Sequence, residues 1–147
     1  MTILSNGHLW KYSEFIANKN YSFKKEQILK SLSKKEIDDA YLSIKEWDAY
    51  SPTPLINLNK LSQELNLNKI FYKDESKRFD LKSFKALGGA YAVQKISKGN
   101  NNIVVSTATA GNHGRSVAWG ARRLGLKCKI FISEFVSDAR GQAMANL

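Results

Sequence analysis

A β-branched run leads directly into a glycine-bearing turn in the segment NIVVSTATAGNHGR, residues 102–115. The run at 102–106 predicts a strand, and the turn after it predicts the start of a helix that ends near Leu124-Gly125. A second apolar and β-branched stretch, residues 127–132, predicts the next strand. The segment therefore indicates a strand–helix–strand unit.

The same alternation extends towards the N-terminus. Residues 70–73 predict a strand, and residues 83–98 predict a helix that ends at Gly99, a residue type common just after a helix. Strand–helix–strand–helix–strand is typical of right-handed parallel crossovers. We therefore predict an α/β fold with a parallel sheet, followed by a last helix that Ser137 caps.

The first 50 residues have a different texture, rich in charged residues between 22 and 49. The tetrad Ser33-Lys34-Lys35-Glu36 has the form of a capping box, and apolar residues follow it at helical spacing. The prolines in Ser51-Pro52-Thr53-Pro54 then stop the helix, because each removes a backbone donor. We therefore divide the chain into an N-terminal helical segment, 1–50, and a domain that covers 51–147.

Composition narrows the class of protein. The chain has 147 residues, of which 43% are hydrophobic and 24% charged, the balance of a globular protein with one domain. One cysteine and two histidines exclude a disulfide framework and argue against a metal site. Neither a membrane-spanning run nor a secretion signal is visible, so we predict a cytoplasmic protein with no membrane partner.

The formal net charge of +10 has three interpretations. A solvated surface accounts for it, and attraction of an anionic ligand such as a phosphate or carboxylate is the alternative. Nucleic-acid binding is the third, but no run of five like charges and no basic strand with interleaved aromatic residues supports it. We therefore expect no nucleic-acid partner.

Lys85 falls in the predicted first turn of its helix, where ligands of open parallel sheets bind. The positive potential of a helix N-terminus disfavours an ammonium group. Lys85 is therefore either a surface lysine or a neutral amine able to attack an aldehyde. Gly88 and Gly89 favour the second interpretation. Each glycine inside a helix costs about 1 kcal/mol, and close approach of a cofactor or a neighbouring backbone would offset that loss.

The turn Gly111-Asn112-His113-Gly114 is the second candidate site. Its glycines let main-chain amides approach a ligand, and the side chain of Asn112 offers both a donor and an acceptor. The alternative is that Asn112 is an ordinary helix cap. His113 is either a base or a side chain packed on its helix. Dinucleotide-binding and P-loop patterns are absent from the sequence.

Other side chains near these segments admit two interpretations. Arg115 binds a carboxylate or forms a structural ion pair. Asp74 and Glu75 are an acid pair or, more commonly, hydrogen-bonded structural residues. Cys128 is expected to be a small buried apolar residue, and Phe131 a core residue.

Three separated motifs resemble, in order and spacing, the fold-type II pyridoxal-phosphate enzymes, the superfamily of tryptophan synthase β and the serine/threonine dehydratases. They are Ser51-Pro52-Thr53-Pro54-Leu55, Ser83-Phe84-Lys85 and Gly111-Asn112-His113-Gly114. Longer stretches around residues 73–79, 84–92 and 107–119 are similar to diaminopropionate ammonia-lyase. The resemblance implies a parallel-sheet three-layer α/β fold of the tryptophan synthase β-like type.

The resemblance also implies roles for two residues. Lys85 is the lysine implied to bind pyridoxal 5′-phosphate covalently, and Asn112 the residue implied to hydrogen-bond the cofactor's phenolic oxygen. The implied reaction is the α,β-elimination of ammonia from 2,3-diaminopropionate, which gives pyruvate and ammonia. The implied partners are a small amino-acid substrate and, in the complete enzyme, a second copy in a homodimer.

The chain departs from the family pattern before each site residue. Ala110 stands where the ammonia-lyases have an aspartate that is a candidate acid/base, and Asp80 and Lys82 replace smaller residues before Lys85. A dehydratase-like elimination of the hydroxyl group from serine, threonine or hydroxyaspartate is therefore an alternative function. A non-catalytic remnant that kept the motifs is another.

Length is the last departure. Family members are more than twice as long, and their glycine-rich phosphate loop and ring-nitrogen partner correspond to positions beyond Leu147. The resemblance therefore implies the N-terminal part of a lyase domain, incomplete at the C-terminus. We expect the isolated chain to expose surfaces meant for burial, to be poorly soluble or oligomeric, and to be inactive.

Overall fold

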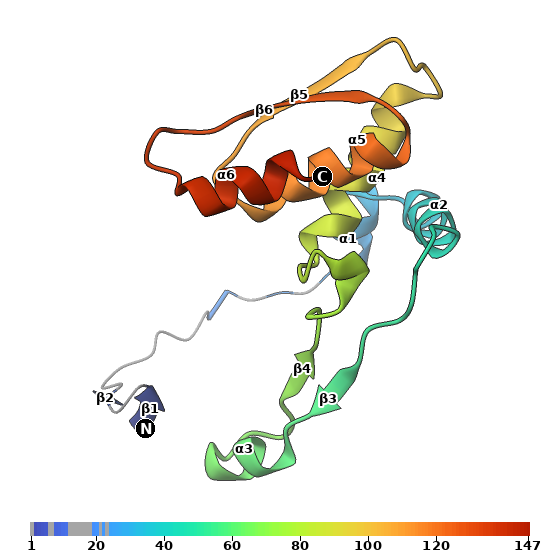
Figure 1. Ribbon diagram of the computed structural model, residues 1–147. Coiled ribbons are helices and arrows are strands. Elements are labelled where there is room, and N and C mark those ends of the chain that lie inside the picture. Colours follow the sequence, from blue (N-terminus) through green and yellow to red (C-terminus); the bar gives the residue numbers. More distant parts are fainter. Residues whose placement is uncertain (1, 6–7, 12–18, 21, 23) are drawn as a thin grey trace.

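The computed structural model describes residues 2–5, 8–11, 19–20, 22 and 24–147. Its largest unit is a pair of parallel strands, β5 (Val104–Ala108) and β6 (Lys127–Phe131), with three helices on one side (Figure 1). These helices are α4 (Lys85–Ser97), α5 (Asn112–Arg123) and α6 (Asp138–Ala145). The predicted elements of residues 83–147 are all present.

The crossover from β5 through α5 to β6 is confirmed as parallel, with Val105 opposite Cys128 and Thr107 opposite Ile130. The helix α5 packs against both strands and against α6. Because side chains alternate along a strand, every second residue of the pair faces away from the helices. Val104 and Phe131 lie on that outer face and are 60% and 52% exposed.

The prediction that Phe131 lies in the core is therefore wrong, because the described helices cover only one face of the strand pair. Cys128 is also exposed rather than buried. It opens on a cavity of about 540 Å³ between β6, α5 and α6, which is also lined by Ile130 and Met144. Neither position could be assigned from the strand pattern alone.

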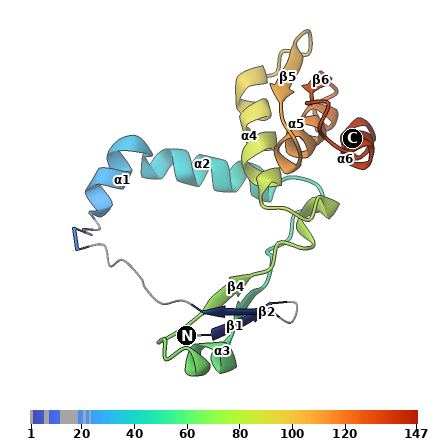
Figure 2. The same cartoon turned by 90° about the vertical axis from the view of Figure 1, so that its left-hand side faces the viewer.

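The strand predicted at 70–73 is present as β4 (Phe71–Lys73), but its predicted parallel pairing is wrong. Among the described residues it pairs antiparallel with β3 (Leu55–Asn57), with Ile56 opposite Tyr72. Between the two strands lies the short helix α3 (Asn59–Glu64), which is followed by Asn66 with a φ of 50°. This turn reverses the chain, so β4 returns beside β3 and extends away from the helical layer (Figure 2).

The N-terminal segment contains two helices, α1 (Lys25–Ser31) and α2 (Lys34–Lys45), and also a hairpin that the sequence did not suggest. Its strands are β1 (Thr2–Ser5) and β2 (His8–Lys11), paired antiparallel. The predicted capping box is confirmed at the start of α2. The Glu36 N–H donates to Ser33 Oγ at 3.2 Å, and the Ser33 N–H donates to Glu36 Oε2 at 2.8 Å. The boundary at residue 50 stays a prediction.

The helices α4 and α5 pack closely because small residues face each other. A Cβ atom added to Gly120 would lie 2.7 Å from the Cα of Ala90, and one added to Gly89 would overlap the side chain of Ser116. Gly88, by contrast, faces open space. A neighbouring helix is thus the reason for glycine at 89, and it does not explain Gly88.

Aromatic rings form the core beside these two helices. The rings of Phe79 and Trp119 lie 4.7 Å apart between centroids, and those of Trp47 and Phe79 lie 5.8 Å apart. Trp47 also donates its indole N–H to Gln94 Oε1 at 2.8 Å, which joins the end of the N-terminal segment to α4. Within the described ranges, no helix combines the length and the apolar character needed to cross a membrane.

Candidate active site

Lys85 lies in the first turn of α4, as the sequence predicts, and is the first residue of that helix; its backbone is held on two sides. Its N–H donates to Ser83 Oγ at 3.2 Å, and its carbonyl oxygen accepts a hydrogen bond from Ser116 Oγ at 2.5 Å. The side chain is exposed, and its Nζ lies 5.5 Å from the centroid of the Phe84 ring. Among the described residues it has no acidic partner, so its amine is available to a ligand.

Asn112 is the first residue of α5, and the cap position belongs to Gly111. The interpretation of Asn112 as the helix cap is therefore wrong, and its exposed amide is not used to cap the helix. The turn before it is held by Thr109, whose Oγ1 accepts the N–H groups of Gly111 at 3.3 Å and Gly114 at 3.2 Å. Thr109 thus fixes the direction in which Asn112 leaves the strand.

A cavity of about 440 Å³ lies beside Asn112, between the first turns of α5 and α6. Its charged lining residues are Arg115 and Arg140, and no acidic residue lines it. Ala110 also lines the cavity and contributes only a methyl group. Two guanidinium groups beside two helix N-termini favour an anionic group such as a carboxylate.

The structure brings Lys85 and Asn112 to the same end of the α4–α5 pair. Ser116 contacts Lys85 and Gly89, and Gly120, one turn further along α5, contacts Ala90. The contacts advance in the same direction along both helices, so both N-terminal ends lie on one side. Lys85 is not among the residues that line the cavity beside Asn112.

Other polar residues lie near Lys85 and Asn112. His113 is exposed and lines a cavity of about 300 Å³ together with residues of α4, β5 and its own helix α5. Arg115 donates from Nη1 to the carbonyl oxygen of Leu81 at 3.2 Å. Its Nε is buried and has no hydrogen-bond partner among the described residues. Lys82 is exposed and has a φ of 55°, and the side chain of Asp80 lies outside the described part of the chain.

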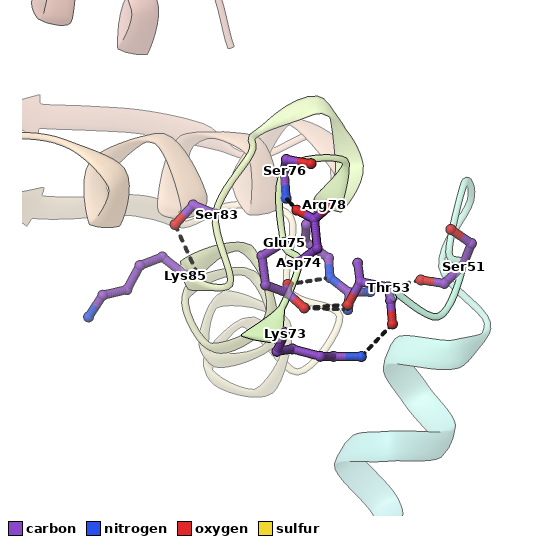
Figure 3. A network of polar contacts seen from close by, with 9 residues as sticks. All are labelled: Ser51, Thr53, Lys73, Asp74, Glu75, Ser76, Arg78, Ser83 and Lys85. Carbon is purple, nitrogen blue, oxygen red and sulfur yellow. Dashed lines mark hydrogen bonds and ion pairs between the residues drawn. The ribbon is translucent and has the colours of Figure 1, made fainter. Parts of the chain in front are cut away.

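A buried polar network precedes Lys85 and was not anticipated from the sequence (Figure 3). Arg78 donates from Nε to Glu75 Oε2 at 2.8 Å and from Nη2 to Thr53 Oγ1 at 2.9 Å. Beside this network, Asp74 accepts the N–H of Ser76 at 3.0 Å in an exposed hydrogen bond. The hydrogen bond from Arg78 lowers the pKa of Glu75, and the hydrogen bonds from Ser76 lower that of Asp74. Both carboxylates are therefore structural acceptors rather than an acid pair.

Comparison with known proteins identifies the class. Residues 46–147 match the model of the pyridoxal-phosphate-dependent enzymes, and the chain belongs to this family. It is 42% identical over 115 residues to diaminopropionate ammonia-lyase from Salmonella typhimurium, covering 63% of this chain and 28% of the relative. It is 38% identical over 101 residues to a biosynthetic L-threonine dehydratase from Staphylococcus epidermidis, covering 69% and 23%.

The fold is shared with solved structures of the same kind. Diaminopropionate ammonia lyase from Escherichia coli, in complex with an aminoacrylate-PLP azomethine reaction intermediate, aligns with a TM-score of 0.70 and 37% identity. That alignment covers 78% of this chain and 32% of the other. The predicted fold-type II resemblance and fold class are confirmed, and the chain spans about a third or less of the length of these relatives.

The residues present fit pyridoxal phosphate in their chemistry. Lys85 supplies a primary amine that has no acidic partner among the described residues. A primary amine is the kind of group that reacts with an aldehyde such as that of the cofactor. Asn112 supplies an amide that can donate to an oxygen of its ring. Both lie at the N-terminal ends of packed helices, where negative charge is favoured.

Proposed function

We propose that this chain is part of a pyridoxal-phosphate-dependent lyase that eliminates ammonia from 2,3-diaminopropionate and yields pyruvate and ammonia. The observation that carries the proposal is the placement of Lys85 and Asn112 on the first residues of two helices whose N-terminal ends lie on one side. The similarity to diaminopropionate ammonia-lyases supports it. A cytoplasmic homodimer is part of the same proposal.

Lys85 is assigned the covalent attachment of the cofactor through Nζ. When bound, pyridoxal phosphate supplies an electron sink for the carbanion that removal of the substrate's α-proton creates. The fixed backbone of Lys85 limits how far its amine can move, because Ser83 and Ser116 hold the residue from both sides. Among the described residues no acidic group holds Nζ, so no ion pair restrains the amine.

Asn112 is assigned a hydrogen bond to the cofactor's phenolic oxygen, and the cavity beside it is assigned the substrate's carboxylate. Arg115 and Arg140 line that cavity, and their charge orients an anionic group there. Arg115 is already fixed through Leu81. The reactive amine and the carboxylate site are thus both tied to α5.

Elimination of a hydroxyl group is the second candidate function, and Ala110 is the observation that favours it. An aspartate at this position would attract the β-ammonium group of diaminopropionate, whereas a methyl group has no such effect. The similarity to a threonine dehydratase agrees with this candidate. Serine, threonine and hydroxyaspartate are its substrates.

A keto-acid assay on the complete lyase of which this chain is proposed to be part, loaded with pyridoxal phosphate, tests both candidates. Pyruvate from diaminopropionate, with little product from threonine or hydroxyaspartate, supports the first candidate, and the reverse pattern supports the second. Lys85→Ala abolishes either activity, while Lys95→Ala, which replaces another exposed lysine of α4, retains it. No keto acid from any of these substrates contradicts both candidates and favours a non-catalytic remnant.

A further inference from the structure

We propose that Arg78 is a positioning residue for Lys85. With Glu75 and Thr53 it forms a buried cluster, here called the Arg78 clamp, that fixes the loop 74–84 and thereby places the amine of Lys85. The inference rests on the proposed function, in which Lys85 holds the cofactor.

The Arg78 clamp uses every nitrogen of the guanidinium group. In addition to its bonds to Glu75 Oε2 and Thr53 Oγ1, Arg78 donates from Nη2 to Glu75 Oε1 at 3.1 Å and from Nη1 to the carbonyl oxygen of Ser51 at 3.0 Å. The hydroxyl of Thr53 donates to Glu75 Oε1 at 2.5 Å. Arg78 is 5% and Thr53 is 7% exposed. A forked, buried ion pair of this kind holds one geometry far better than an exposed pair does.

The clamp connects segments that are distant in the sequence. Thr53 belongs to the segment before β3, whereas Glu75 and Arg78 follow β4. Lys73 adds a second tie, since its Nζ donates to the carbonyl oxygen of Thr53 at 2.6 Å. The start of the loop is therefore anchored to the β3–β4 pair.

The loop between the clamp and Lys85 has a backbone that needs such anchoring. Phe79, directly after Arg78, has a φ of 47°, and Lys82 has a φ of 55°. Non-glycine residues rarely adopt these left-handed values, so surrounding contacts must hold them. The Phe79 ring packs on Trp119, and the guanidinium of Arg78 lies 5.7 Å from the Phe79 ring centroid. The clamp thus sets the direction in which the chain continues from Arg78 towards Lys85.

The far end of the loop is anchored to α5 through Leu81 and through Lys85 itself. In Figure 3 the Lys85 side chain extends away from the clamp, and no bond joins the two. Arg78 therefore acts on Lys85 through the backbone. Its charge is paired with Glu75, so its effect on Lys85 is one of position.

The test measures how fast Lys85 is labelled. The purified protein is exposed to pyridoxal phosphate, reduced with borohydride, and mapped by peptide to give the label on each lysine. The variants are Arg78→Gln, which removes the charge and the fork, and Arg78→Lys, which keeps the charge alone. Val93→Ala is the control, because Val93 is buried in a cluster with Val117, Ala121 and Leu126 that does not touch the loop.

We expect Arg78→Gln and Arg78→Lys each to slow Lys85 labelling about tenfold or more, because misplacement of a reacting group by about 1 Å costs up to about 100-fold. Val93→Ala lowers the unfolding temperature but labels Lys85 at the original rate. Labelling that follows the unfolding temperature in all three variants overturns the proposal, since the clamp would then be structural only. Full labelling in Arg78→Lys overturns it too, because charge alone would suffice.

The two proposals fail in distinguishable ways. If Lys85 takes no label in the unsubstituted protein, the proposed function and this inference fall together. If Lys85 is labelled selectively and at the same rate in Arg78→Gln, the proposed function stands and Arg78 has no positioning role.

Discussion

Lys85 combines a fixed backbone with a side chain that has no acidic partner among the described residues, and both features matter for a reactive amine. The backbone position of Lys85 depends on Ser116, which donates to its carbonyl oxygen. No sequence motif singles out Ser116, which lies three residues after His113. The position of Lys85 at a helix start could be predicted from Ser83 and the glycines that follow. The contact with Ser116 could not, because it joins residues 31 apart.

Gly88 and Gly89 of α4 are expected to respond differently to replacement by alanine. Gly89→Ala destabilises the protein by about 1–3 kcal/mol, since the added methyl overlaps the Ser116 side chain. Gly88→Ala has open space around it and is expected to be neutral or stabilising by up to about 1 kcal/mol. Urea unfolding of the two variants measures the difference. Equal losses at both positions would show that the close α4–α5 contact is absent.

Helices could be predicted where the sequence signal lies within the helix itself or directly beside it. The helices α2, α4 and α5 begin and end within a few residues of their predicted bounds, because caps and periodicity lie in the sequence itself. The pairing of β4 was not predictable in this way. Its partner depends on the turn after α3, and the strand pattern at 70–73 is the same for either partner.

The capping box of α2 provides the element-scale prediction. Ser33→Ala removes the oxygen that accepts the Glu36 N–H and lowers the free energy of unfolding by about 1 kcal/mol. Ser31→Ala, at the exposed end of α1, is the matched control and should change little. Amide hydrogen exchange measures the expected loss of protection within α2. Unchanged protection of α2 in Ser33→Ala would count against a stabilising role for the cap.

For the whole molecule, the pH dependence of stability follows from Glu75. Its folded-state pKa is lowered from the ordinary 4.5, mainly by the hydrogen bond from Arg78. The stabilising contribution is therefore complete above pH 4.5 and is lost as the pH falls through the lower folded-state value. Glu75→Gln flattens this part of the acid-unfolding curve, and Glu64→Gln, on exposed α3, leaves it in place. If Glu75→Gln and Glu64→Gln lose stability in the same way as the pH falls, Glu75 is not the source of this pH dependence.

Exposed apolar side chains predict how the whole chain behaves in solution. Val104 and Phe131 lie on the bare face of the strand pair, and Ile96 and Phe135 are 75% and 91% exposed. Such a surface favours self-association. Sedimentation velocity of the purified 147-residue chain is expected to show oligomers, and the chain is expected to be inactive by itself. A monomeric species with turnover contradicts both expectations.

How much of the site was predictable also depends on scale. Lys85 and Asn112 could be named from motifs, and the structure brings them to one end of the helix pair. The Arg78 clamp was missed because its three members come from two segments more than 20 residues apart. A signal was nonetheless present, since Arg78 lies in the stretch 73–79 that resembles the ammonia-lyases.

The central claim is that Lys85 holds pyridoxal phosphate, and selective trapping tests it most directly. Borohydride reduction of the purified protein with pyridoxal phosphate, followed by peptide mapping, is expected to place the label on Lys85. The label is expected to disappear in Lys85→Ala and to persist in Lys95→Ala. Label scattered over many lysines, and unchanged in Lys85→Ala, would contradict the account.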